Sequence, residues 1–324
     1  MDYRALAAQL MRALRGSRSQ TAFSRRLGYA SNIAYPWESG RRSPTASEAL
    51  RAAARTGVDV RAAVASFFQR QLPEELAHED PTSPVFVAAL LRAARGKIPM
   101  RLLAERLGQS RSAVSRILSG ATEPRLPVFL HLVDASSRRL LDLLAGFVDV
   151  ASLPAARAAW QKLEALRRLT YDNPLTEAVP RFLELEQYAA LPRHEPGWIA
   201  SRLGISLEDE QRTLEDLATA GLVHFDGKRW QLEKGRSVDT SRDPRGAARL
   251  AHHWTRLASE RIASGADGRF SYLVFGTDDE TLEAIYELRL RYVRELRTLV
   301  RKARVATRVI VANAHLFPID GAGA

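Results

Sequence analysis

Residues 19–45 read SQTAFSRRLGYASNIAYPWESGRRSPT, and residues 101–127 read RLLAERLGQSRSAVSRILSGATEPRLP. The two stretches belong to an internal repeat, because a shift of 80 positions aligns residues 15–50 with 95–130 without gaps and makes nine of 36 positions identical. The identical positions include three glycines, a proline and two leucines, which are residues that fix backbone geometry and core packing. The sequence therefore predicts two copies of one small helical unit.

Each copy predicts four short helices in the same order. Ser19 and Ser110 are the residue type that caps a helix N-terminus, and Gly28 follows the second helix as a C-terminal glycine should. Ser31 is expected to open the third helix of the first copy. The expected helices are 2–15, 20–27, 31–38 and 44–58 in the first copy, and 84–95, 99–107, 111–119 and 125–133 in the second.

The two copies differ at a position inside the third helix, where the first has Pro36 and the second has Arg116. A proline in a helix interior costs about 3 kcal/mol and removes a backbone hydrogen bond. Two readings stay open at this point. The third helix of the first copy is short or kinked, or Pro36 still lies in its first turn.

Two short helices joined by a glycine-containing turn are typical of a helix-turn-helix. Both copies resemble lambda-repressor/Cro-like (XRE-type) units, and the resemblance covers about 115 residues. It implies a bacterial transcription regulator that reads the major groove of double-stranded DNA with the helices near 31–38 and 111–119. The residues that the resemblance and their chemistry assign to DNA binding are Gln20, Ser31, Asn32, Tyr35, Arg41, Arg42, Arg101, Ser110, Arg111, Ser112, Ser115 and Arg116.

The assigned residue types suit different parts of a duplex. Arginine pairs with guanine O6 and N7, and asparagine with adenine N6 and N7, so Arg111, Arg116 and Asn32 are candidate base readers. Gln20 begins the second helix of its copy, where a phosphate is favoured, whereas the second copy has Met100 there. Arg41 and Arg42 follow the third helix and are expected to contact phosphates.

Positive charge is concentrated in the half that carries the repeat. The chain has a net charge of +11, and residues 1–150 hold 22 Lys and Arg against 13 Asp and Glu, whereas residues 151–324 hold 26 against 24. A GC-rich coding background explains the preference for arginine, but it does not explain the asymmetry. The asymmetry favours a polyanionic partner for the first half.

The second half predicts a different arrangement. Residues 196–232 show two short helices followed by strands that flank Asp226-Gly227, which is typical of a winged helix. The acidic helix in this segment argues against insertion into a DNA groove. Residues 270–277 and 304–319 each predict a strand around a helix at 278–303. This half resembles the domain-of-unknown-function family 4423 through the winged-helix segment, YLVFGTDDETLEAI and NAHLFPID, which implies a regulator.

The expected fold class is mainly α, with tandem helix-turn-helix domains, a winged-helix segment and a small C-terminal α/β (strand-helix-strand) element. The expected domains are 1–70 and 85–150 for the two helix-turn-helix units, 71–84 for a linker, 151–235 for the helical/winged-helix domain and 236–324 for the α/β domain.

The remaining expectations concern partners and chemistry. The chain has no cysteine, no catalytic motif and no membrane-spanning stretch, so we expect no enzyme activity, no cofactor, no metal and no membrane. The expected location is the cytoplasm, in association with the nucleoid. We expect a homodimer, with a protein partner or small effector bound through the C-terminal half. Two alternative functions stay open: a non-specific or RNA-binding module, and a protein-interaction scaffold.

Overall fold

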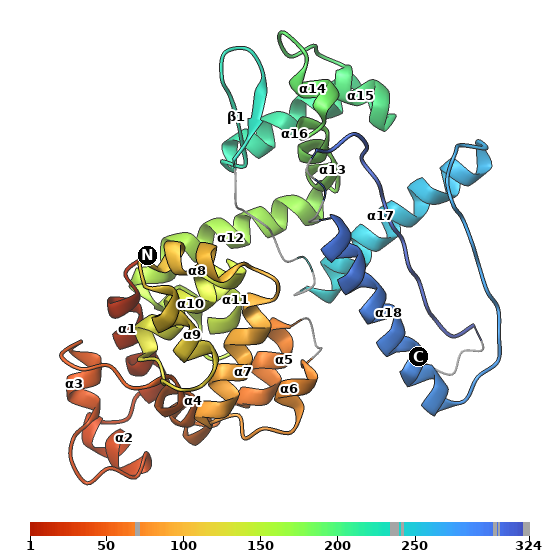
Figure 1. The fold of residues 1–324 in the computed structure, drawn as a ribbon. Coiled ribbons are helices and arrows are strands. Elements are labelled where there is room, and N and C mark those ends of the chain that lie inside the picture. The colour runs from red at the N-terminus through yellow and green to blue at the C-terminus, as the bar shows by residue number, and fades with distance from the viewer. Residues whose placement is uncertain (69–71, 234–239, 241–242, 301–302, 304, 320–324) are drawn as a thin grey trace. The chain divides into compact units, whose positions relative to one another are not determined.

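The computed structural model describes residues 1–68, 72–233, 240, 243–300, 303 and 305–319. The protein is mainly helical, and the described residues contain one sheet, which has two antiparallel strands. The chain divides into two compact units, Met1–Ala165 and a unit that begins at Leu166 (Figure 1). Each unit has a hydrophobic core of its own.

The N-terminal unit contains both copies of the repeat. The helices predicted in the two copies are present, with ends that lie within a few residues of the prediction, whereas α5, α6 and α11 were not predicted. The first copy has α1 (Tyr3–Arg15), α2 (Gln20–Arg26), α3 (Ala34–Glu38), α4 (Ala46–Arg55) and α5 (Val60–Phe67). The second copy has α7 (Pro84–Arg95), α8 (Met100–Leu107), α9 (Arg111–Leu118), α10 (Leu126–Ser137) and α11 (Leu140–Leu144), and it is followed by η1 (Val150–Ser152) and α12 (Pro154–Asp172).

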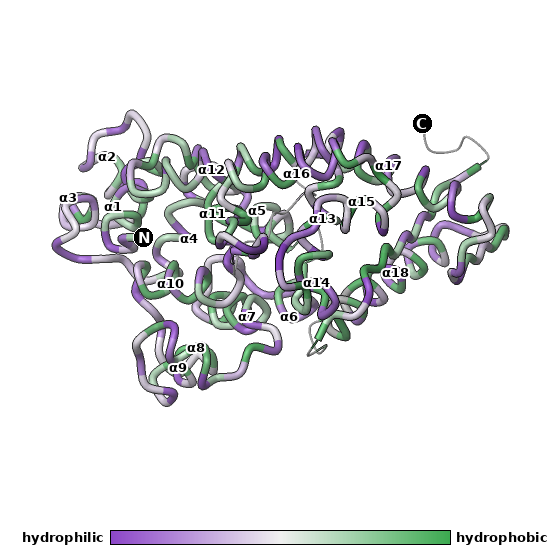
Figure 2. The backbone as a smooth tube through the Cα atoms, turned by 90° about the horizontal axis from the view of Figure 1, so that it is seen from above, coloured by the Kyte–Doolittle hydropathy of each residue, from purple (hydrophilic) through white to green (hydrophobic). Residues whose placement is uncertain are grey.

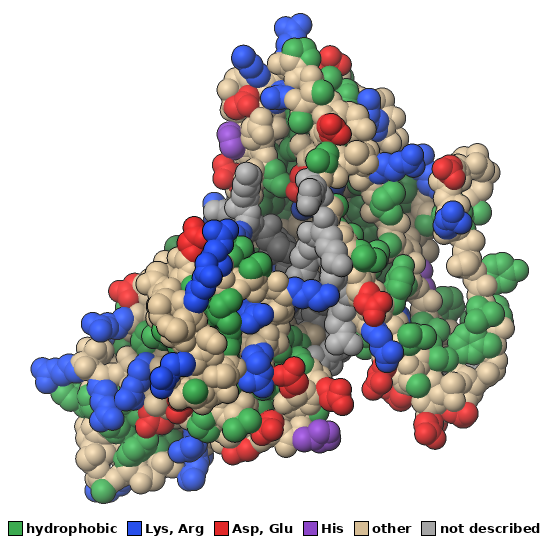
Figure 3. Space-filling model, viewed as in Figure 1, with side chains coloured by type: hydrophobic (Ala, Val, Ile, Leu, Met, Phe, Trp, Pro, Cys, Tyr) green, Lys and Arg blue, Asp and Glu red, His purple; other side chains and the backbone are tan. Residues whose placement is uncertain are grey.

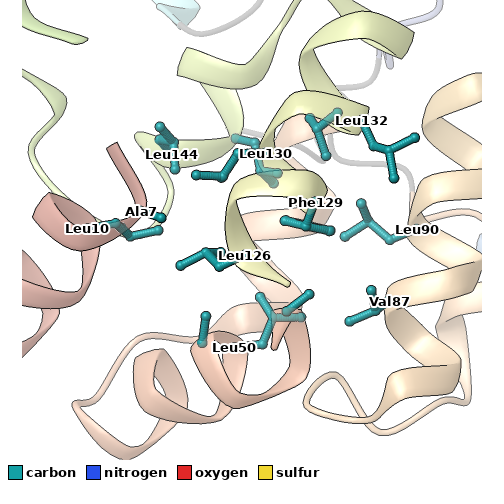
Figure 4. Packing of buried hydrophobic residues seen from close by; sticks show 14 of the residues in the cluster. Ala7, Leu10, Leu50, Val87, Leu90, Leu126, Phe129, Leu130, Leu132 and Leu144 are labelled. Atoms are coloured by element: carbon teal, nitrogen blue, oxygen red, sulfur yellow. The ribbon is translucent and has the colours of Figure 1, made fainter. Parts of the chain in front are cut away.

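The two copies share one core instead of forming separate ones. Figure 4 shows apolar side chains of α10 between α1 of the first copy and α7 of the second. Tyr3 of α1 adds a polar contact, because its hydroxyl donates to Asp134 Oδ2 at 2.6 Å while its ring stacks on His131 with centroids 4.4 Å apart. Burial and the neighbouring carboxylate raise the pKa of the Tyr3 hydroxyl. The two copies are thus held together by side-chain contacts, in addition to the peptide segment that connects them.

The segment predicted as a linker is a packed connection in its described part, residues 72–84. It contains the short helix α6 (Glu74–Ala77), and Leu76 is fully buried in the shared core. The Arg61 guanidinium donates to the carbonyls of Leu76 (2.8 Å), Ala77 (2.6 Å) and Glu79 (2.6 Å), which satisfies the carbonyls at the end of α6. The prolines and acidic residues that suggested an open linker therefore border a fixed helix.

Gly146 marks a close approach between the copies. A Cβ added at Gly146 would lie 2.8 Å from Ala63 Cβ and 3.1 Å from Ala63 Cα. We expect Gly146→Ala to lower the free energy of unfolding by about 1–3 kcal/mol, because the backbones must move apart. Urea unfolding measures this effect. Gly276→Ala serves as the control, since nothing lies within 4 Å of the added Cβ, and Ala63→Gly should restore part of the loss in the double variant. Equal stability of Gly146→Ala and the parent protein would contradict the close approach.

The C-terminal unit contains short helices, a hairpin and two long helices. The Asp226-Gly227 turn predicted from the sequence is confirmed, with Val223 paired to Leu232 and Phe225 to Trp230. Backbone N–H groups of Arg229 and Lys228 donate to Asp226 and, with the Gln231 amide, lower the pKa of its carboxyl to about 2. The elements are α13 (Leu175–Leu183), α14 (Glu186–Ala189), α15 (Trp198–Leu203), α16 (Leu207–Thr219), β1 (Val223–Phe225), β2 (Trp230–Leu232), α17 (Pro244–Ala263) and α18 (Asp279–Val300).

The predicted strand-helix-strand element is wrong in its strands. The helix is present as α18, but residues 270–277 form no strand, and the described part of 304–319 forms only an isolated bridge from Ala306 to Leu185. The reason is that an apolar, β-branched run favours extended backbone, but its composition does not determine whether another strand is available to pair with it. The basic end expected for this helix, at 301, 302 and 304, lies outside the described residues.

His194 gives the C-terminal unit an expected response to pH. Burial lowers the pKa of its imidazole below the usual 6.5, although Glu210 and Glu195 oppose the shift, and Tyr188 Oη lies 3.2 Å from its Nδ1. The unfolded chain then binds the proton more readily, so stability falls as the pH drops through 6.5. We expect urea midpoints to decrease between pH 7.5 and 5.5, and to decrease less in His194→Gln. An identical pH dependence in both proteins would contradict this assignment.

Candidate nucleic-acid interface

The turn between α2 and α3 is fixed by short local bonds. Ser19 Oγ accepts from Ala22 N at 3.2 Å and caps α2, as predicted. Gly28 has φ +90°, a conformation that favours glycine. The buried Ser24 joins the two helices, since its hydroxyl donates to Gln20 O at 2.8 Å and accepts from Ala34 N at 3.1 Å. α3 is therefore held on α2 by a polar contact inside the first copy.

The third helix of the first copy begins later than predicted. Ser31 does not open it, because α3 starts at Ala34 and no side chain caps it from Ile33. The matching helix α9 begins three positions earlier in the repeat, where Ser110 Oγ accepts from Ala113 N at 3.2 Å. The first copy has Ala30 at that position, which offers no acceptor. Ser31 and Asn32 thus lie exposed in the turn before α3.

The sequence left open whether the third helix is short or kinked, or whether Pro36 lies in its first turn. The helix is short, and Pro36 also lies in its first turn. α3 is short, and Pro36 is its third residue, so the missing N–H belongs to the first turn, where helical N–H groups have no partner within the helix. The Pro36 carbonyl accepts from Arg42 N at 3.0 Å, and in the second copy the Arg116 carbonyl accepts from Thr122 N at 3.1 Å. The backbone after the third helix therefore forms the same hydrogen bond in both copies.

The exposed face of α9 carries the predicted polar residues. Val114, Ile117 and Leu118 are buried, so the opposite positions face solvent. Arg116 Nε donates to Thr122 Oγ1 at 3.2 Å, which restrains its side chain, and Ser112 Oγ lies 3.0 Å from Ser110 Oγ. The predicted site residues of the second copy that the structure leaves exposed are Arg101, Ser110, Arg111, Ser112, Ser115 and Arg116.

Gln20 has a protein partner that the sequence did not predict. Its amide Nε2 donates to Glu38 Oε2 at 3.0 Å, and the Gln20 side chain is half-buried. Glu38 is only 5% exposed and also accepts two bonds from Arg15, at 2.6 and 3.2 Å. Glu38 therefore ties α1, α2 and α3 together. A comparison of the copies could have revealed it, because the buried Leu118 occupies the matching position.

The predicted cations of the first copy lie on the surface beside Tyr35. The Arg41 guanidinium lies over the Tyr35 ring, 5.4 Å from its centroid, and Tyr35 is 47% exposed. Arg42 is also exposed. Figure 3 shows Lys and Arg side chains gathered over the part of the N-terminal unit where Figure 1 draws α1 to α4, and acidic side chains near α6. The structure thus places Tyr35, Arg41 and Arg42 close together.

The segment predicted as winged has an acidic surface on its longest helix. α16 begins with Glu208, Asp209 and Glu210, and Glu210 turns inward, where it accepts from Gly197 N at 3.2 Å and from Ala200 N. Glu210 therefore caps α15, a role that sequence reasoning missed. Its place beside Glu208 and Asp209 in the first turn of α16 gave no signal that distinguishes it from these exposed neighbours.

Among the described residues, no three His, Cys, Asp or Glu side chains gather closely enough to hold a metal ion. None of the helices they form has both the length and the apolar composition that crossing a membrane requires.

Comparisons with known proteins bear on the second half of the chain. A family model described as Domain of unknown function (DUF4423) matches residues 154–319, about half of the chain. No curated protein and no solved structure was found to match. The repeat lies outside the matched residues, so its resemblance to lambda-repressor/Cro-like units stays a prediction.

Proposed function

The chain belongs to the family described as Domain of unknown function (DUF4423), and since that description assigns no activity, we propose from the N-terminal unit that it is a sequence-specific, double-stranded-DNA-binding transcription regulator. The two copies of the repeat act as helix-turn-helix units. α3 with the turn before it, and α9, read the major groove. The regulator works in the cytoplasm on the nucleoid.

The observation that carries the proposal is the exposed polar face of α9. Arg111, Ser112, Ser115 and Arg116 are exposed on a helix that is capped by Ser110 and backed by a full apolar core. Side chains at the N-terminal end of such a helix reach base edges when the helix enters the major groove. Arginine recognises guanine there through two hydrogen bonds.

The first copy has exposed polar residues around its third helix as well, but they are of different types from those on α9. Asn32 Oδ1 accepts from Tyr35 N and from Ser24 Oγ, each at 3.3 Å, so within the described part of the chain it is Asn32 Nδ2 that remains to donate to a base. Arg41 and Arg42 follow α3 and suit phosphate contacts. The acidic α16 would be repelled by phosphates, so we assign the winged-helix segment a structural role and not a DNA contact.

Fluorescence anisotropy tests the proposal. The full chain is titrated into a labelled random duplex and into a duplex from upstream of its own gene, at two salt concentrations. We expect an operator to bind about a thousandfold more tightly than random DNA, and affinity to fall steeply with salt. If the upstream fragment carries no operator, selection from a random duplex pool supplies one. Equal binding to every duplex would favour the non-specific alternative, and no binding would favour RNA or protein partners.

We also infer that the C-terminal half pairs two chains. Tyr272 and Leu273 are 93% and 79% exposed in the apolar run 270–275, which pairs with no described strand. Exposed apolar segments of this kind mark sites where a protein associates with another chain, and a second copy offers the same segment. Light scattering should give twice the chain mass, and Leu273→Asp should give the mass of one chain. A single-chain mass for the parent protein would leave this segment for a different protein partner.

A further inference from the structure

The two copies of the repeat meet through a pair of reciprocal hydrogen bonds. Ala46 N donates to Pro124 O at 3.0 Å, and Leu126 N donates to Pro44 O at 2.8 Å. They flank an antiparallel bridge between Thr45 and Arg125. Each of the three position pairs, 44 with 124, 45 with 125 and 46 with 126, is separated by the repeat length of 80. Equivalent positions of the two copies therefore contact one another, with donor and acceptor exchanged.

A reciprocal contact of this kind requires a two-fold axis. When residue i of one copy contacts residue j of the other, and j of the first contacts i of the second, the interface is isologous. Two copies related by a simple translation would bring unlike surfaces together, and equivalent residues would not meet. The bridge at Thr45 and Arg125 therefore lies on a local two-fold axis within one chain.

Helix packing obeys the same symmetry. α1 packs on α10 and α7 packs on α4, which are equivalent pairs with the copies exchanged. α5 packs on α11, and α4 packs on α10, so equivalent helices also meet each other. Figure 2 shows α2 and α3 on one side of α4 and α10, and α8 and α9 on the other. The chain thus contains an internal dimer whose two candidate reading elements are related by the axis.

We propose that one chain binds one inverted repeat in DNA, with α3 on one half-site and α9 on the other. The inference rests on the proposed function and deepens it. The half-sites of an inverted repeat are themselves related by a two-fold axis of the duplex, so a protein with the same symmetry can contact both at once. Dimers of single helix-turn-helix chains use half-sites about one helical turn, roughly 34 Å, apart. Here a single chain supplies both halves.

The two half-sites differ in sequence. α9 presents Arg111 and Arg116, which suit guanines, whereas the turn before α3 presents Asn32, which suits adenine, and Pro36 replaces the second arginine. The site is therefore inverted in geometry but unequal in sequence, and the chain binds it in one orientation. A second chain is not needed to complete one site.

Selection from a random duplex pool with the full chain, followed by a stoichiometric titration, tests the inference. We expect the enriched duplexes to contain two unlike half-sites in inverted orientation, with centres about one helical turn apart, and to saturate at one chain per duplex. This ratio holds whether or not the C-terminal halves pair, because each chain carries its own complete site. Half-sites in the same orientation, or two chains on one duplex, would overturn the inference.

Substitutions in each copy of the repeat can show which half-site of the DNA that copy contacts. Asn32→Ser keeps an oxygen for Tyr35 N and removes the amide, and we expect it to lose about tenfold or more in affinity and to relax preference in one half-site only. Arg111→Ala should do the same in the other half-site. Arg256→Ala, which removes an exposed charge on α17, is the control. Relaxation of the same half-site by both variants would overturn the inference.

The result also separates this inference from the proposed function. If the full chain enriches no duplex and binds none at low salt, both fail. If it enriches a site that contains a single half-site, or one that needs two chains, the protein remains a sequence-specific DNA binder and only the internal-dimer reading fails.

Discussion

Replacement of Arg111 and Arg116 together by alanine is expected to weaken binding to the selected operator by between about 30-fold and 10⁴-fold. Each bidentate arginine–guanine contact contributes roughly 1–3 kcal/mol of discrimination, and tenfold in affinity corresponds to about 1.4 kcal/mol. Both side chains are exposed on α9, and Arg116 is restrained by Thr122. Binding to random duplex should weaken far less, since phosphate contacts from other arginines remain.

The loss can be assigned to base contacts because the helix itself should persist. Alanine is the best helix former, the Ser110 cap is untouched, and the buried positions of α9 are unchanged. Anisotropy titrations at one salt concentration compare the double variant with Arg256→Ala, which should bind like the parent protein. Unchanged operator affinity in the double variant would show that α9 does not read DNA, and it would favour the protein-scaffold alternative.

Glu38→Ala is expected to lower the free energy of unfolding of the N-terminal unit by about 2–4 kcal/mol. The substitution leaves the Arg15 guanidinium and the Gln20 amide without their buried acceptor, and loss of one partner of a buried pair costs about 3–5 kcal/mol. Partial exposure of Arg15 reduces this cost. Urea unfolding at pH 7 measures the change, and operator affinity should also fall because α3 loses its attachment through Glu38, although it keeps the Ser24 contact to α2.

A double variant separates the ion pair from the packing. Arg15→Met with Glu38→Leu removes both charges, and the second copy already carries a buried leucine at the matching position, Leu118. Apolar replacement of a whole buried pair is often neutral or stabilising, so the double variant should be more stable than Glu38→Ala. If Glu38→Ala and the parent protein unfold at the same urea concentration, the Glu38 contacts contribute nothing to stability.

Features set by neighbours in the chain were predictable from the sequence. The caps at Ser19 and Ser110, the turn at Gly28 and the hairpin at Asp226-Gly227 each depend on a few adjacent residues, and the structure has all of them. The late start of α3 depends on the absence of an acceptor at Ala30, which appears only when the copies are compared position by position.

Contacts between distant residues were not predictable. The composition of 71–84 indicated a linker, but Leu76 is buried in the shared core and Arg61 binds the carbonyls of α6. The 80-residue repeat showed that two units exist without showing that they share a core. Likewise, the runs at 270–277 and 304–319 have the composition of strands, but composition does not determine whether a partner strand is present.

The contact between Glu38 and Gln20 at the candidate site also joins residues that are distant in the sequence, and local sequence patterns did not predict it. The position of Gln20 at the start of α2 suggested a phosphate contact, whereas its amide donates to a residue 18 positions away. The exposed polar face of α9 was predictable, because apolar positions at helical spacing define its buried side and leave the other side to solvent.

The shared core also constrains the order in which the protein can fold as it is synthesised. Helix α1 emerges from the ribosome first, but α10, on which it packs, lies more than 100 residues later in the chain. Until the second copy has emerged, the first exposes the apolar face that α10 covers, including Ala7 and Leu10. The nascent chain therefore depends on completion of both copies, and a message truncated between them would yield an aggregation-prone fragment instead of half a regulator.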